Sequence, residues 1–106
     1  MIRRVAVGLL VLAAGSQNTS AQSAADRLAE GRRLFEQSCG VCHTKPTLAS
    51  GLYGPAVSAE TMGGRADVMR DVISNGTPRM PGFKYHFTPD QIDTIVVYVK
   101  TLPANR

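Results

Sequence analysis

The sequence has only two cysteines, no convincing strand, no basic stripe and no apolar run long enough for a membrane helix. Its longest apolar run, residues 5–14 (VAVGLLVLAA), is about half of the roughly 20 residues that a spanning helix needs. No cysteine follows that run, which argues against a lipid anchor. Charges alternate in sign along the rest of the chain, which argues against nucleic-acid binding. At this length the chain forms one domain at most.

The first 21 residues have the order of parts of a secretory signal peptide. Two arginines precede the apolar run, and the polar stretch after it ends in small residues (TSA, 19–21) of the kind that a signal peptidase accepts. We therefore expect a signal peptide over residues 1–21, a mature domain over residues 22–106, and no stable membrane insertion after cleavage. The leader holds two of the twelve basic residues and none of the eight acids, so the net charge of +4 belongs partly to it.

Three helical patterns stand out after the leader. The first covers about residues 24–37 and has a narrow apolar stripe, made of Ala24, Leu28, Gly31 and Phe35. Glycine costs about 1 kcal/mol inside a helix, so Gly31 on this stripe predicts another helix that crosses closely there. A short middle helix covers about residues 65–74, and Asn75-Gly76 predicts its end.

The closing helix has the clearest start. The segment TPDQ, residues 88–91, supplies an N-cap, a proline in the first turn, an acid and a capping-box glutamine. Apolar residues follow at helical spacing, and Pro103 is expected to end the helix. Two long irregular segments separate the three helices, and such loops are uncommon in a compact domain unless they are functional. We therefore predict an all-α protein with three main helices and long loops.

Both cysteines lie in the segment CGVCH, residues 39–43. Disulfide exchange, zinc binding and covalent haem attachment all use this cysteine spacing. Zinc is disfavoured because it takes four ligands and Cys39, Cys42 and His43 offer three. A thioredoxin-like dithiol is disfavoured because it needs a βαβ setting. Haem uses every residue, because the two thiols add to its vinyl groups and the imidazole binds its iron; such attachment takes place outside the cytoplasm, which agrees with the leader.

An iron bound by His43 has a sixth position to fill. The candidates are Met62, Met69, Met80 and His86. Met69 lies on the apolar side of the middle helix and is assigned to the core, whereas Met62 precedes two glycines and stays an alternative. Met80 is preferred because prolines on both sides hold its loop, which brings a thioether to the iron at little entropic cost. His86 is assigned to the surface.

With these parts in this order, the chain resembles the class I c-type cytochromes. The shared features are the helix with Gly31 and Phe35, CGVCH, Gly54-Pro55, Met80-Pro81 and a closing helix with an aromatic residue. The resemblance implies a cytochrome c fold wrapped around one haem c, bound covalently through Cys39 and Cys42. It also implies that His43 and Met80 are the two axial ligands of the iron.

The resemblance implies roles for further residues. In that family the first and last helices cross at the glycine, so Gly31 would meet the closing helix and Phe35 would pack near Tyr98. The backbone carbonyl of Pro55 would accept a hydrogen bond from Nδ1 of His43 and fix its ring. No tryptophan is available to bind a haem propionate; the possible substitutes are Tyr53, Arg65, Arg79 and Tyr85.

The function that the resemblance implies is that of a periplasmic monomer that carries one electron as its iron alternates between Fe(III) and Fe(II), and that is not an enzyme. Its expected partners are periplasmic redox proteins, with a dehydrogenase as donor and an oxidase or other protein as acceptor. The closing part of the chain also resembles haem modules of periplasmic dehydrogenases, including quinoprotein types, so a dedicated electron-accepting subunit is the alternative. A haem sensor or peroxidase-like protein is a weaker alternative, because it needs an open sixth position.

Overall fold

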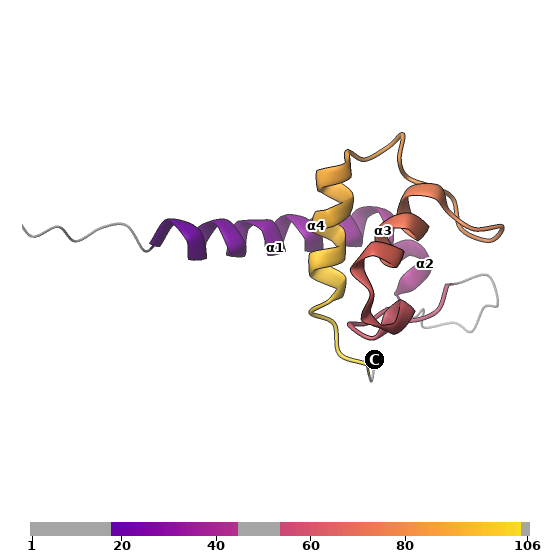
Figure 1. Cartoon of the computed structure of the whole chain (residues 1–106), viewed down its shortest axis with the longest axis horizontal. Coiled ribbons are helices and arrows are strands. Elements are labelled where there is room, and N and C mark those ends of the chain that lie inside the picture. Colours follow the sequence, from indigo (N-terminus) through magenta and orange to yellow (C-terminus); the bar gives the residue numbers. More distant parts are fainter. Residues whose placement is uncertain (1–17, 45–53, 105–106) are drawn as a thin grey trace, which may run out of the picture.

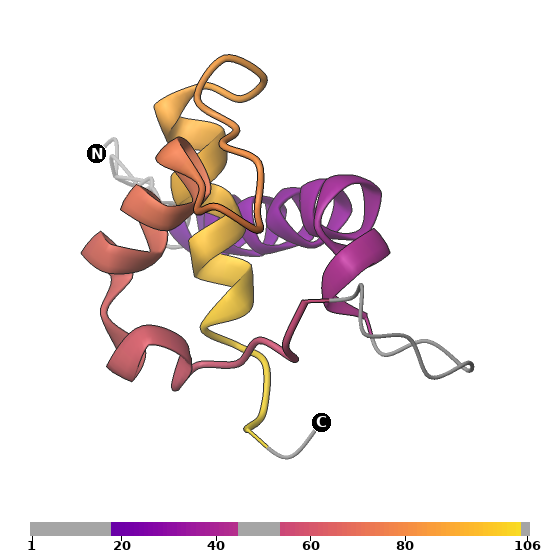
Figure 2. The same cartoon turned by 90° about the vertical axis from the view of Figure 1, so that its right-hand side faces the viewer.

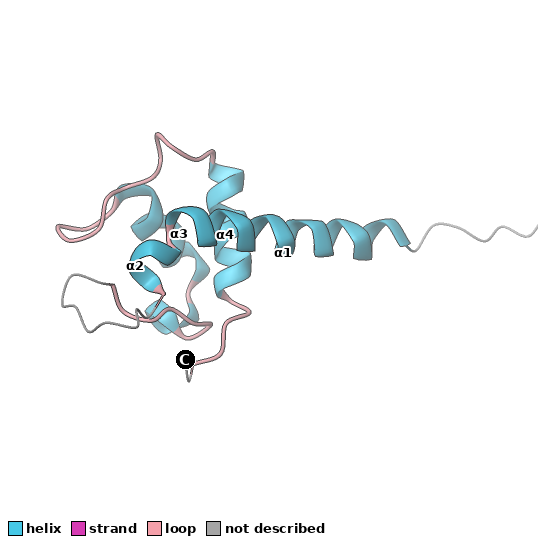
Figure 3. Ribbon diagram, turned by 180° about the vertical axis from the view of Figure 1, so that it is seen from behind, coloured by secondary structure: helices cyan, strands magenta, loops and turns pink. Residues whose placement is uncertain are grey.

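The computed structural model describes residues 18–44 and 54–104, and helices and loops make up these two segments (Figures 1 and 3). The elements in chain order are α1 (Asn18–Ser38), α2 (Gly40–His43), the 3-10 helix η1 (Thr61–Gly64), α3 (Ala66–Asn75) and α4 (Pro89–Val99). Within the described segments the extended pairing is limited to one isolated bridge, between Thr77 and Met80. The predicted all-α fold is therefore confirmed, with α1, α3 and α4 as its three main helices.

The core lies where α1 crosses α4, and the crossing point is Gly31 (Figures 1 and 2). A Cβ atom at Gly31 would clash with the carbonyl oxygen of Thr94 and would lie 3.0 Å from Cβ of Tyr98. Next to this contact, the rings of Phe35 and Tyr98 pack with their centroids 5.3 Å apart. Both contacts confirm what the resemblance implied for the two helices. The buried apolar residues are Leu34, Phe35, Cys39, Met69, Phe87, Ile92, Ile95, Val96, Val99 and Leu102.

We expect Gly31→Ala to lower the free energy of unfolding by about 2 kcal/mol, because the added methyl group overpacks a contact made by backbone atoms. Thermal or denaturant melting measures this loss. Helix propensity alone predicts the opposite sign, since alanine is favoured over glycine by about 1 kcal/mol. The exposed-site variant Ala29→Gly on the same helix calibrates that propensity term. A Gly31→Ala protein more stable than the wild type would contradict the close crossing.

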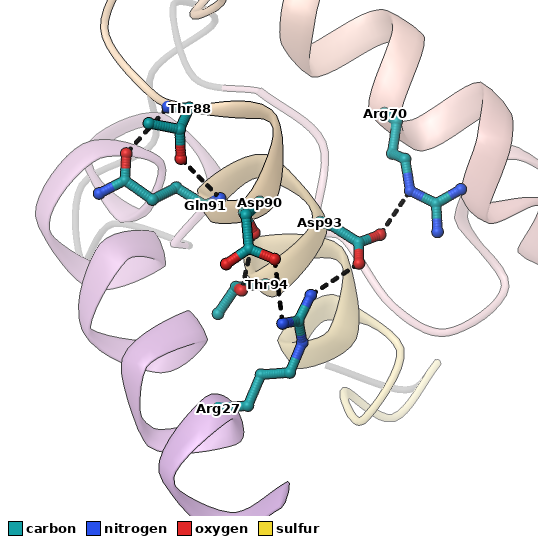
Figure 4. Close-up of polar contacts among 7 residues, drawn as sticks. All are labelled: Arg27, Arg70, Thr88, Asp90, Gln91, Asp93 and Thr94. Carbon is teal, nitrogen blue, oxygen red and sulfur yellow. Dashed lines mark hydrogen bonds and ion pairs between the residues drawn. The ribbon is translucent and has the colours of Figure 1, made fainter. Parts of the chain in front are cut away.

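Local signals in the sequence fix the end of α3 and the start of α4. Thr88 accepts a hydrogen bond from the backbone N–H of Gln91 at 3.2 Å, and the side chain of Gln91 accepts one from the N–H of Thr88 at 2.9 Å (Figure 4). This is the predicted capping box. α3 ends at Asn75, and the next residue, Gly76, has φ +73°, a conformation that glycine allows.

Two helix ends differ from the sequence prediction. α1 begins at Asn18 rather than near residue 24, because the apolar stripe marks only the part of α1 that meets α4 and no glycine or proline interrupts residues 18–30. α4 ends at Val99, before Pro103, and a turn follows that keeps Leu102 buried. The expected cleavage after residue 21 falls within α1, and residues 1–17 lie outside the described residues. None of the described helices is both long enough and apolar enough to cross a membrane.

One carboxylate joins the three main helices. Asp93 of α4 accepts a hydrogen bond from Arg27 of α1 at 2.7 Å and another from Arg70 of α3 at 2.5 Å (Figure 4). Arg27 also reaches Asp90, at 3.1 Å. Arg70 first, and Arg27 with it, hold the pKa of Asp93 below its ordinary value. These ion pairs fasten α1 and α3 to the same turn of α4.

We expect Asp93→Asn to lower the free energy of unfolding at pH 7 by about 1 kcal/mol. This loss is at the upper end of the range of stabilisation that exposed ion pairs contribute. The pKa of Asp93 is lower in the folded protein than in the unfolded chain, where it is about 3.9. The stabilisation is therefore fully present above the unfolded-state pKa and is lost as the pH falls through the folded-state pKa. Denaturant melts between pH 2 and pH 7 should therefore show that the free energies of unfolding of the variant and the wild type converge at the acid end. Glu60→Gln, at an exposed acid, serves as the control. A difference that persists unchanged at pH 2 would refute the ion-pair explanation.

Candidate functional site

The CGVCH segment forms one helical turn directly after α1. The backbone N–H of Cys39 donates to the carbonyl of Phe35 at 2.8 Å, and the N–H of His43 donates to the carbonyl of Cys39 at 2.9 Å. Residues three apart on a helical turn share a face, so Cys39 and Cys42 lie on the same side, with Cys39 buried and Cys42 exposed. The sequence did not predict α2, because a turn of four residues is too short to show helical periodicity.

The imidazole of His43 is held by the segment that starts at residue 54, which lies beside α2 (Figure 2). Its Nδ1 lies 2.7 Å from the carbonyl oxygen of Pro55. A carbonyl only accepts, so Nδ1 is the donor. In the neutral imidazole with that tautomer, Nε2 has the lone pair that can bind a metal. The N–H of Gly54 donates to the carbonyl of Cys42 at 2.8 Å and ties this segment to the CGVCH turn. The role of Pro55 as support for a haem ligand stays a prediction.

The Cys39 thiol is not an activated nucleophile. Burial, and secondarily the nearby Cys42, raises the pKa of Cys39 to about 11. Its thiol is therefore protonated at neutral pH, whereas the reactive cysteine of a disulfide oxidoreductase has a lowered pKa. The argument against disulfide exchange rests on the fold, because the described residues contain helices and no βαβ unit.

Met80 lies on the loop between α3 and α4, which occupies the same end of the molecule as α2 (Figures 1 and 3). Its side chain is partly buried. The backbone of Met80 exchanges two hydrogen bonds with Thr77, at 2.9 and 3.2 Å, which close a tight turn. A Cβ atom at Gly82 would lie 2.8 Å from the carbonyl oxygen of Ser74, so the loop packs closely on the end of α3. Contacts within the polypeptide therefore fix the backbone position of Met80, the preferred sixth ligand.

The other candidates for the sixth position have different environments. Met69 is 4% exposed and belongs to the core, as predicted. Met62 is 48% exposed and has φ +54°, followed by two glycines that also have positive φ. His86 is exposed and packs edge-on against Phe87, with ring centroids 4.5 Å apart.

Three of the four candidates for propionate binding lie among the described residues, and all three are exposed. Tyr53 lies outside the described residues. Arg65 forms an ion pair with Asp67 at 2.8 Å. Tyr85 is 94% exposed, and Arg79 is exposed on the loop that carries Met80.

The donor set near α2 fits a haem better than a bare metal ion. In residues 18–44 and 54–104, no three His, Cys, Asp or Glu side chains gather as ligands of one metal ion. A porphyrin supplies its own ring of nitrogens, so it needs only axial ligands and anchoring groups from the protein. Two sulfurs on one turn and one free imidazole nitrogen meet that need. The side chains of Val57 and Phe83 pack against the apolar core and stay partly exposed.

Comparison with known proteins agrees with this chemistry. Residues 26–99 match the family described as cytochrome c oxidase, cbb3-type, subunit III. The cytochrome c subunit of 4-cresol dehydrogenase (hydroxylating) from Pseudomonas putida is 30% identical over 105 residues, which cover 97% of this chain and 88% of that protein. Cytochrome c55X from Paracoccus denitrificans (strain Pd 1222) is 37% identical over 93 residues, which cover 86% of this chain and 88% of that protein. The chain therefore belongs to the cytochrome c family of haem-containing electron carriers.

Proposed function

We propose that this cytochrome is a periplasmic single-electron carrier with one haem c, joined covalently to Cys39 and Cys42. His43 and Met80 are its axial ligands in this proposal. The observation that carries it is the contact between Nδ1 of His43 and the carbonyl of Pro55, because it leaves Nε2 free for iron. When bound, the haem supplies one-electron chemistry between Fe(III) and Fe(II).

The protein's own residues would restrict the haem to electron transfer. His43 on α2 and Met80 in its tight turn would hold the haem iron from two fixed segments of backbone. With both bound, no position on the iron would be open to a substrate. The Pro55 carbonyl holds the tautomer and the orientation of the His43 ring. The neutral thioether of Met80 favours the reduced state relative to a second histidine.

A visible spectrum and a covalent-haem stain test the proposal. We expect exported protein, run on a denaturing gel, to keep its peroxidase stain. Its mass should equal that of residues 22–106 plus one haem, and that mass also locates the cleavage site. A measured mass equal to that of the polypeptide without haem would contradict the proposal. Recovery of haem-loaded protein in the cytoplasmic fraction alone would overturn the periplasmic location.

A second candidate function is that of a dedicated electron-accepting subunit of a dehydrogenase. The similarity to the cytochrome c subunit of 4-cresol dehydrogenase favours it, since the match covers almost the whole chain. The haem site would be the same in both cases, and only the partner would be fixed. Co-purification with a dehydrogenase that survives moderate salt would favour the subunit, whereas a free monomer under those conditions favours the mobile carrier.

A further inference from the structure

Gly54 packs directly against the face of the His43 ring. A Cβ atom at Gly54 would lie 2.8 Å from Cε1, 3.0 Å from Nδ1 and 3.3 Å from Nε2 of that imidazole. Cε1 is bonded to both nitrogens, and the nitrogens lie only 0.2 and 0.5 Å farther from the Cβ position than Cε1 does. An approach in the plane of the ring would place them much farther away, so the glycine faces the plane near Cε1 rather than its edge. Any side chain at residue 54 would have to displace the imidazole or move its own backbone.

The backbone itself does not demand glycine at residue 54. The glycines with positive φ among the described residues are Gly63, Gly64 and Gly76, and Gly54 is not one of them. Alanine could therefore adopt the local conformation. What requires the missing side chain is the ring of His43.

The contact complements the hydrogen bond to Pro55. The χ2 angle of histidine has a broad energy well, and a single hydrogen bond tolerates tens of degrees of misalignment. The bond between Nδ1 and the Pro55 carbonyl therefore fixes the direction of the ring only loosely. The backbone of Gly54 cannot retreat freely either, because its N–H is bonded to the carbonyl of Cys42.

We infer that Gly54 is a positioning residue that sets the rotation of the His43 imidazole plane by packing on its face. This inference rests on the proposed function, in which Nε2 of His43 binds the haem iron. Pro55 then selects the tautomer, and Gly54 limits the rotation that the hydrogen bond leaves free. In the haem-loaded protein, the glycine would thereby set the orientation of the imidazole that binds the iron without touching the iron itself.

The first test uses the wild-type haem protein. In the reduced, diamagnetic state, an NMR nuclear Overhauser effect is expected between an α-proton of Gly54 and Hε1 of His43. One α-proton of Gly54 points in the direction in which a Cβ atom would lie 2.8 Å from Cε1. This measurement needs no variant. A protein with bound haem in which that cross-peak is missing would overturn the inference.

The second test compares two glycine-to-alanine variants. In the oxidised protein, the spread of the haem methyl proton shifts depends on the orientation of the axial imidazole plane. Gly54→Ala should change that spread, whereas Gly31→Ala should lower the melting temperature and leave the spread unchanged. Gly31 is the matched control because its added methyl group meets an even closer contact, with the Thr94 carbonyl oxygen, at the helix crossing. Equal changes in both variants, or none in Gly54→Ala, would overturn the inference.

Two kinds of failure can be told apart. If the wild-type chain carries no covalent haem, the proposed function falls and this inference falls with it. If haem is bound and the Gly54 cross-peak is absent, the proposed function stands and only the positioning role is lost. If Gly54→Ala cannot be produced with haem, the wild-type cross-peak decides alone.

Discussion

The double variant Cys39→Ser/Cys42→Ser is expected to carry no covalent haem and to lose cooperative thermal unfolding. Outside the helix crossing the polypeptide buries little, because no residue from 54 to 68 and none from 70 to 86 is buried. A chain this short gains from a cofactor that adds to its core. Without haem, its free energy of unfolding should fall to about zero, compared with about 5–15 kcal/mol for an ordinary domain. Circular dichroism during heating measures the loss.

Two controls separate the loss of haem from the cost of the substitutions. Val41→Ser changes a residue between the cysteines that is 67% exposed, so it should keep both the haem and a cooperative melt. Cys39→Ala/Cys42→Ala removes the same thiols without placing a hydroxyl at the buried position of Cys39, and it should behave like the serine pair. A serine or alanine pair that melts cooperatively near the wild-type temperature would show that the polypeptide folds on its own.

How much of the fold could be predicted depended on how local each signal was. The start of α4 was predictable because the capping box and the proline at residue 89 act within one turn. The crossing at Gly31 was predictable because a glycine on an apolar stripe weakens its own helix unless a neighbour needs the space, and the resemblance supplied its partner helix. The start of α1 was not predictable, because the first turns of this helix lie beyond its contact with α4 and carry no apolar pattern.

Contacts between distant residues were harder to predict. Asp93 joins Arg27 and Arg70 across three helices, and no spacing in the sequence links these positions. The conformation of Met62, with φ +54°, was also unpredictable, since residues other than glycine rarely adopt it. These features arise from tertiary structure rather than from local sequence preference.

The candidate site shows the same division. CGVCH and the Gly54-Pro55 pair were visible in the sequence, and the resemblance supplied the hydrogen bond to His43. The packing of Gly54 on the ring was not visible, because the motif gives no reason for the glycine and residue 54 is eleven positions from the histidine. Only the three-dimensional structure distinguishes a glycine that the backbone requires, such as Gly76, from one that a neighbouring ring requires.

Met80→Ala is expected to abolish the weak near-infrared absorption band that arises from sulfur-to-iron charge transfer in the oxidised protein. It should also let carbon monoxide bind the reduced protein readily and lower the reduction potential, because methionine ligation raises it. Met80 is only partly buried, so the loss of stability should be about 1–2 kcal/mol and the fold should survive. Absorption spectra with and without carbon monoxide, and a redox titration, measure these effects.

The other methionines provide the matched controls for this experiment. Met62→Ala removes a thioether that is 48% exposed, and Met69→Leu keeps the volume of a core side chain that is 4% exposed. Both variants should keep the near-infrared band and exclude carbon monoxide. If the band survives in Met80→Ala and disappears in either control, the ligand is the other methionine and the tight turn at Thr77 has a purely structural role. If the wild-type reduced protein itself binds carbon monoxide readily, the sixth position is open, and the haem-sensor or peroxidase-like alternative replaces the carrier.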